Sequence, residues 1–269
     1  MIGAAAGRAE GAGGLSVLTG AIGTVPDPAR IAAALESSVA GLPQADRAPA
    51  IVDVLRAAVP STESWLRAHG ATAEQASDSV ADVERKLGRY GLRGTGLDWF
   101  CAVLTARVVA VGRLQFELGD TAADGSPAWG VHVPETGPLD PDACDRSFAL
   151  APAVLRALAP DHAAEWWRCR SWLLDPGLPD ALGSDANTVR FARRFLLDPP
   201  GPDDATEGDD SVAKFVFGTD RAGARAPGAS RPPGRLAAAV LARWGSGGHW
   251  TVRTGTAPVT TSDTAAPPA

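Results

Sequence analysis

Two short segments carry the side chains best suited to proton transfer. They read "GRLQFEL" and "WGVHV", and in each of them apolar and polar residues alternate, which is typical of strands with one polar face. The turn-rich stretch between them predicts an antiparallel hairpin. When the apolar faces of the two strands match, His132 lies opposite Gln115, and Arg113 and Glu117 lie diagonal to it.

This polar face could support acid–base chemistry on an amine. A histidine whose pKa is near neutrality can accept the proton of an attacking amine, and a carboxylate can orient its imidazole. We therefore take His132 as the candidate catalytic base and Glu117 as the alternative. Arg113 and Gln115 are candidate substrate- or cofactor-binding residues. A solvated sheet face with an ordinary ion pair would give the same pattern, so both interpretations stay open at this point.

A third segment, "WWRCRSWLLDP", concentrates the rarest side chains of the chain and predicts a strand. Alternation places Cys169 and Ser171 on one face, and we take both as further candidate binding residues. An exposed cysteine beside two arginines would have a lowered pKa and, with His132, could form a thiol hydrolase. A buried free thiol is the commoner state of a strand-interior cysteine. The tryptophans favour core packing, and Trp172 is predicted to be buried.

The elements that must position these residues begin with helices. Asp27, followed by a proline, is a strong helix start, and Thr72 with Gln75 forms a capping box. The helix that follows the capping box is expected to end near Gly91. Farther along the chain the apolar period shortens from near 3.6 to 2 residues, which indicates strands.

More strands are predicted at "TVRFARRFLL", "VAKFVFG" and "GGHWTVR". Helices and strands are mixed rather than strictly alternating, which favours an α+β fold with a mixed, mostly antiparallel sheet flanked by helices. We expect a flexible tail at residues 1–25, a helical N-terminal domain at 26–95, an α+β domain at 96–253 and a second flexible tail at 254–269.

Composition argues against several functions. The 269 residues carry a net charge of −6 and contain no run of Lys and Arg, so nucleic acid is not an expected partner. The longest apolar run, residues 99–111, is too short to span a bilayer, and the N-terminus lacks a signal-peptide pattern. Three scattered cysteines and four histidines give no zinc spacing, so no metal is expected. We expect a soluble, cytoplasmic protein that acts on a small molecule.

An ordered series of segments resembles a known protein family. The segments are "GLDW", "GRLQF", "HVP", "PLDPDACDRS", "CRSWLLDP", "SDANTVRFARRF", "FVFG" and "GGHW", which together cover most of residues 96–250. The series is similar to bacterial acyltransferases that join an N-terminal helical domain to a C-terminal domain of the GNAT-like, or N-acetyltransferase-like, class. The resemblance implies acyl-CoA as co-substrate and N-acyl transfer to a small amine or amino-group acceptor.

One segment departs from the family pattern. The family usually carries Gln and Arg in the helix before "GGHW", whereas Ala237 and Ala238 stand there in this chain. The resemblance names neither the acceptor, nor the acyl chain, nor the oligomeric state. The loss of two polar side chains would suit an alternative hypothesis, a non-catalytic ligand- or protein-binding module on a degenerate acyltransferase fold. The intact "GRLQF", "HVP" and "CRSWLLDP" segments favour the enzyme.

Overall fold

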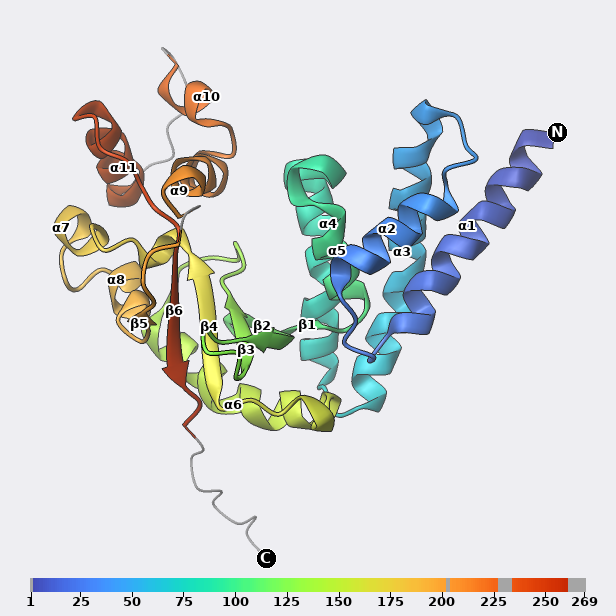
Figure 1. Cartoon of the computed structure of the whole chain (residues 1–269), viewed down its shortest axis with the longest axis horizontal. Helices are drawn as coiled ribbons and strands as arrows, with labels where there is room; N and C mark the ends of the chain where they lie inside the picture. Colours follow the sequence, from blue (N-terminus) through green and yellow to red (C-terminus); the bar gives the residue numbers. More distant parts are fainter. Residues whose placement is uncertain (1, 202–203, 227–233, 261–269) are drawn as a thin grey trace, which may run out of the picture. The chain divides into compact units, whose positions relative to one another are not determined.

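The computed structural model describes residues 2–201, 204–226 and 234–260. Helices come first in the chain, and a six-stranded sheet with flanking helices follows (Figure 1). The predicted α+β class is confirmed, because a helical region precedes a mixed sheet instead of alternating with its strands.

The chain divides into two compact units. The first comprises Met1–Gly119 and Leu150–Ala163, and the second comprises Asp120–Ala149 and Ala164–Ala269. The predicted domain boundary after residue 95 therefore lies too early, because the helix and the strand that follow it belong to the helical core. A single cut does not separate the units either, since a later helical segment returns to the first one.

The first unit opens with a series of helices. In chain order they are α1 (Ile2–Ala21), α2 (Pro28–Ser38), α3 (Gln44–Ala68), α4 (Ala73–Thr95) and α5 (Leu97–Leu104). The prediction of a flexible tail at residues 1–25 was wrong, because α1 packs against the helices that follow. Leu18 is fully buried, and Gly14 lies so close to Leu35 and Val54 that a side chain at this position would meet both.

Local signals set the helix ends largely as predicted. The Asp27 carboxylate accepts a hydrogen bond from the Ala29 N–H at 3.0 Å. In the capping box, the Thr72 hydroxyl accepts from the Gln75 N–H at 3.1 Å, and the Gln75 side chain accepts from the Thr72 N–H at 2.9 Å. Gly91 breaks α4 with a φ of 67°, after which one further helical turn follows. A positive φ is inexpensive only for glycine, so the predicted stop is a kink rather than an end.

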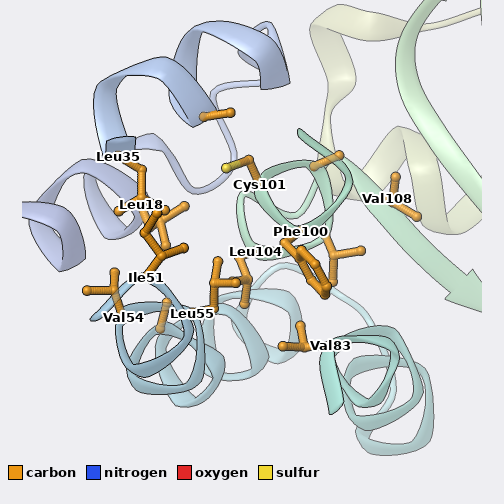
Figure 2. Packing of buried hydrophobic residues seen from close by; sticks show 14 of the residues in the cluster. Leu18, Leu35, Ile51, Val54, Leu55, Val83, Phe100, Cys101, Leu104 and Val108 are labelled. Atoms are coloured by element: carbon orange, nitrogen blue, oxygen red, sulfur yellow. The ribbon is translucent and has the colours of Figure 1, made fainter. Parts of the chain in front are cut away.

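Apolar side chains from all five helices meet in one core. Leu18, Leu55 and Phe100 are fully buried there, and Figure 2 draws them together with Val83 of α4 and Val108 of the first strand, which belong to the same core. This packing explains why residues 97–111 belong to the helical unit: their side chains complete its interior.

The sheet has the strand order β1-β2-β3-β4-β6-β5. Its strands are β1 (Val108–Val111), β2 (Leu114–Thr121), β3 (Pro127–His132), β4 (Trp166–Ser171), β5 (Leu196–Leu197) and β6 (Arg253–Pro258). β1 pairs antiparallel with β2, β3 pairs parallel with β4, and β6 pairs antiparallel with both β4 and β5. Helix α6 (Pro141–Leu158) forms the crossover between β3 and β4. The two strands of the predicted hairpin, β2 and β3, are neighbours in this order.

The rest of the second unit is built from short elements. They are η2 (Trp172–Leu174), α7 (Leu178–Leu182), α8 (Asn187–Ala192), α9 (Asp204–Val212), η3 (Ala213–Phe217), α10 (Arg221–Arg225) and α11 (Arg235–Gly245). A 3₁₀ turn, η1 (Pro160–His162), precedes β4 and belongs to the first unit.

Four predictions for this region were wrong. One is the strand at "GGHWTVR", of which only Arg253 belongs to β6. "TVRFARRFLL" forms part of α8 and only a two-residue strand. Phe191 is fully buried in α8, and its ring lies 5.5 Å from the ring of Phe195, which follows the helix. "VAKFVFG" is helical and ends at Gly218, which adopts the left-handed conformation. The expected tail at 254–269 begins with most of β6, which pairs with β4 along its whole length; residues 261–269 lie outside the described residues.

Candidate functional site

The parallel strands β3 and β4 of the second unit diverge at their carboxyl ends. Their ladder ends at Gly130 and Arg168, although β3 continues to His132 and β4 continues to Ser171. β4 stays paired with β6 throughout, so the gap in pairing concerns only the edge that faces β3. The backbone groups on these two facing edges are therefore not used by a β3–β4 ladder. In sheets of this kind, ligands bind in the crevice outside the carboxyl ends of the strands.

Two predicted site residues lie where these strands diverge. His132 is the last residue of β3 and is half-buried. Ser171 is the last residue of β4, and its hydroxyl oxygen accepts a hydrogen bond from the Leu173 N–H at 3.1 Å. This contact caps the short helix η2 and leaves the hydroxyl proton of Ser171 as a donor. The structure thus brings His132 and Ser171 to the same end of the β3–β4 pair.

Cys169 precedes this end of β4 and is 1% exposed. Burial raises the pKa of its thiol to about 12, and the nearby Arg168 only partly opposes that effect. A thiol with this pKa stays protonated at neutral pH and is a poor nucleophile. The structure therefore supports the buried free thiol rather than a thiol hydrolase.

The tryptophan-rich stretch around β4 forms part of the core. The ring of Trp167 lies 5.4 Å from that of Trp129 and 5.4 Å from that of Phe148. Trp172 is 7% exposed, which confirms its predicted burial. Trp166, on the other face of the strand, is the exposed member of the group. Most of these rings pack in the core and fix the position of β4. The carboxyl end of β4, beyond its pairing with β3, is therefore rigidly supported.

The candidate residues of β2 are arranged differently from the prediction. Arg113 lies in the tight turn between β1 and β2, not on the strand itself. Gln115 was expected on a solvated face but is 2% exposed, because β2 is covered on both sides, and its Nε2 has no hydrogen-bond partner. Glu117 accepts a hydrogen bond from Arg107 Nε at 2.8 Å. Arg107 thus forms an ion pair with the carboxylate that the prediction takes as the alternative base.

These β2 residues belong to the first unit, whereas His132 belongs to the second. The proposed alignment of Gln115 and Glu117 with His132 therefore stays a prediction. The pattern of "GRLQFEL" identified a strand correctly, but alternation alone did not reveal that both of its faces are covered.

Two buried carboxylates were missed by the sequence analysis. Asp209, in α9, accepts hydrogen bonds from the Trp250 N–H at 2.9 Å, from Trp244 Nε1 at 2.6 Å and from His249 Nδ1 at 2.7 Å. Arg221 forms an ion pair with it at 2.7 Å. Burial alone would raise the pKa of Asp209, but these donors outweigh it and hold the pKa below its ordinary value.

Asp175 is the second buried carboxylate, and it accepts several hydrogen bonds in the same way. It accepts from the N–H and the hydroxyl of Thr251 at 2.7 and 2.8 Å and from Gly177 N–H at 2.7 Å, and Arg243 pairs with it at 3.0 Å. The guanidinium of Arg243 also lies over the Trp250 ring. Asp209 thus holds the "GGHW" segment and Asp175 holds the threonine that follows it, although both carboxylates are distant in sequence. Neither has a local pattern that could have identified it, although the motif itself was recognised.

The departure from the family pattern falls in α11. Ala237 is buried and Ala238 is exposed, so only the first faces the interior of the unit. Among the described residues, no group of three or more His, Cys, Asp or Glu side chains is arranged to hold a metal ion. Within the same residues, no helix is long and apolar enough to cross a membrane.

Comparison with known families places this architecture. The family model described as "GNAT-like C-terminal domain" matches residues 108–257, the part of the chain that contains the sheet. The chain belongs to this family. No curated protein matches the chain.

Solved acyltransferase structures are similar over most of the chain. One, in complex with decanoyl-CoA and teicoplanin, is 31% identical with a TM-score of 0.68, and the match covers 81% of this chain and 68% of that one. Another, in complex with CoA and 10C-teicoplanin, is 28% identical with a TM-score of 0.70 and covers 88% and 81%. A mutant acyltransferase in complex with octanoyl-CoA is 28% identical with a TM-score of 0.70, and the match covers 87% of this chain and 81% of that one.

Proposed function

We propose that this chain is an acyl-CoA-dependent acyltransferase that transfers the acyl group to an amine of a small-molecule acceptor. The observation that carries the proposal is the divergence of β3 and β4 in a chain that belongs to the GNAT-like C-terminal domain family. The similarity to acyltransferases solved with CoA, octanoyl-CoA and decanoyl-CoA supports acyl-CoA as the donor.

The donor would lie between the diverging ends of β3 and β4. The amide groups of an extended pantetheine arm can pair with strand edges in the way an added strand does. The edges at residues 131–132 and 169–171 have no ladder partner in each other and are suited to this role. The thioester would then lie near His132, the residue with which β3 ends.

The reaction needs one proton acceptor and one proton donor. The amine nitrogen attacks the thioester carbonyl, the new C–N bond forms, and the C–S bond breaks. The nitrogen loses a proton, and the departing CoA thiolate gains one, so the products are an amide and free CoA. His132 is the group that we propose as acceptor of the amine proton, with Glu117 as the alternative base.

The acceptor is proposed by analogy. Because two similar acyltransferases were solved with teicoplanin or 10C-teicoplanin, a glycopeptide of this kind is the first acceptor to test. The complexes with octanoyl-CoA and decanoyl-CoA make these two donors the first choice.

A turnover assay tests the function. The purified chain is incubated with octanoyl- or decanoyl-CoA and teicoplanin, and CoA release and the acylated product are measured by thiol titration and mass spectrometry. We expect His132→Asn to lower kcat by about 10²- to 10⁴-fold with an unchanged melting temperature. The matched control is His162→Asn, an exposed histidine in η1, which should keep full activity.

Three other outcomes would redirect the assignment. Equal activity of the His132 variant would remove this residue from the mechanism, and a damaging Glu117→Gln would move the base to β2. Donor binding without product formation on any amine would favour the second candidate function, the non-catalytic binding module. The observation that favours it is the pair Ala237 and Ala238 in α11, where the family usually has Gln and Arg.

A further inference from the structure

A cavity of about 410 Å³ lies in the second unit, away from the diverging strand ends. Its walls come from α6, from the beginning of β4, from the end of β6 and from the residues after α8. Trp167 belongs to the part of β4 that is still paired with β3, whereas His132 and Ser171 lie past the end of that pairing. The cavity is therefore a separate feature from the proposed donor site, and its volume is that of a small-molecule pocket.

The body of the cavity is apolar and aromatic. Phe148 of α6 meets the ring of Trp167 edge to face, at 5.4 Å between centroids and an interplanar angle of 67°. Ala257 of β6 is the residue paired with Trp167 across the strands. Because this position carries only a methyl group, space remains between the sheet and α6. A flat or branched apolar group fits the chemistry of these walls.

The polar lining residues are Thr260 and the ion pair of Arg194 with Asp145. Most N–H groups of the Arg194 guanidinium already donate hydrogen bonds. Arg194 donates from Nε and Nη2 to Asp145 Oδ1, from Nη1 to the Arg190 carbonyl and from Nη2 to the Pro141 carbonyl. Four of its five N–H groups are therefore engaged. The guanidinium also lies over the Phe148 ring, 6.0 Å from its centroid.

The carboxylate of this pair faces solvent. The side chain of Asp145 is 64% exposed, and both hydrogen bonds from Arg194 end on its Oδ1. Asp145 Oδ2 accepts neither of these hydrogen bonds, so it has more capacity left for a ligand than the N–H groups of Arg194. An anionic ligand would find one remaining N–H group and would stand beside a fixed carboxylate, which repels it. An ammonium group would find the Oδ2 oxygen of a carboxylate, which accepts neither of the hydrogen bonds from Arg194.

We propose that this cavity binds a small amphipathic amine, with its apolar body between Phe148, Trp167 and Ala257 and its ammonium group on Asp145. The site does not depend on acyl transfer. It could be occupied whether or not the chain turns over an acyl-CoA, and its test uses binding alone.

The probe is 2-phenylethylamine, whose ring and ammonium group match the two parts of the cavity. Binding to the full chain at pH 7 is measured by saturation-transfer NMR and calorimetry. The comparison compounds are 2-phenylethanol, which has no charge, and 3-phenylpropionate, which has the opposite one. We expect the amine to bind at least about tenfold more tightly than the carboxylate, because a charge-assisted contact is gained in one case and repulsion in the other.

Two variants separate the charge from the cavity. Asp145→Asn keeps a carbonyl acceptor for Arg194 but removes the negative charge, and it should weaken amine binding by about tenfold. Ala257→Leu fills the cavity and should abolish binding of all three compounds. The matched controls are Asp180→Asn and Ala222→Leu, at exposed positions of α7 and α10, which should bind as the unchanged protein does.

The proposal has clear contrary results. It is overturned when 2-phenylethylamine does not bind at millimolar concentration, when 3-phenylpropionate binds as tightly as the amine, or when neither variant changes amine binding. Should Asp145→Asn fail to fold, Ala257→Leu with an unchanged melting temperature still decides whether the amine uses this cavity.

Discussion

The first unit and the C-terminal part of the second unit are stabilised by different means. In the first, helices meet through an almost wholly apolar core that includes Leu18, Leu55 and Phe100. In the second, the segment around "GGHW" is organised by the buried carboxylates Asp175 and Asp209, each of which accepts several hydrogen bonds. The first arrangement can be read from periodicity, whereas the second depends on contacts between residues far apart in sequence.

This difference also determines how each region responds to substitution. An apolar helical core tolerates conservative exchange of its side chains as long as volume is kept. A buried carboxylate with several donors fixes the positions of all its partners, because each unsatisfied group would cost free energy. The polar arrangement therefore holds the β6 side of the sheet, next to β4, in one defined position.

The largest effect is expected in the helical core. Phe100→Ala should lower the free energy of unfolding by about 3–5 kcal/mol, because it removes a fully buried aromatic side chain and leaves a cavity. Denaturant unfolding followed by far-UV circular dichroism measures this loss. The conservative Phe100→Leu should lose much less. Similar stability of the Ala variant and the unchanged protein would show that α5 contributes little to the core.

A smaller loss of folding stability is expected when the buried carboxylate of Asp209 is changed. Asp209→Asn should lower the free energy of unfolding by about 1.5–3 kcal/mol, because hydrogen bonds and an ion pair to a charged acceptor are weakened. The neighbouring Asp210→Asn is the matched control, since Asp210 is exposed, and it should be neutral. Equal effects of the two substitutions would contradict the role assigned to Asp209.

The pH dependence of that loss is the finest test. The pKa of Asp209 in the folded chain lies below its ordinary value of 3.8, so its contribution is fully present above that value and is lost as the pH falls through the folded-state pKa. Arg221 and His249 both contact this carboxylate. The stability difference between the unchanged protein and Asp209→Asn should therefore be present at neutral pH and shrink below about pH 4. A difference that grows in acid would reverse the assigned sign.

The sequence predicted the parts of the fold that depend on local signals. The cap at Asp27, the capping box at Thr72 and the strand "GRLQFEL" follow from residues close together in the chain. "TVRFARRFLL" was predicted as a strand, whereas its first half lies in α8 and only its last two residues form β5, because a short apolar segment fits both spacings.

The candidate site could be predicted only in part. His132 and Ser171 were singled out from strand patterns, and the structure brings both to the open end of β3 and β4. Gln115 was misjudged, because burial of both faces of β2 is a tertiary effect. The ladder between the parallel strands β3 and β4 ends before the strands do, and no local sequence pattern encodes where it ends.

Donor binding tests the central claim most directly. Thermal melting is measured with and without CoA, acetyl-CoA and decanoyl-CoA. A ligand that binds only the folded chain stabilises it by about 2.7 kcal/mol at one hundred times its dissociation constant. For a chain of this size each kcal/mol raises the midpoint by about 2–4 °C, so we expect a shift of several degrees with decanoyl-CoA and little with adenosine. The absence of any shift at millimolar concentrations of all three CoA compounds would contradict the acyltransferase assignment.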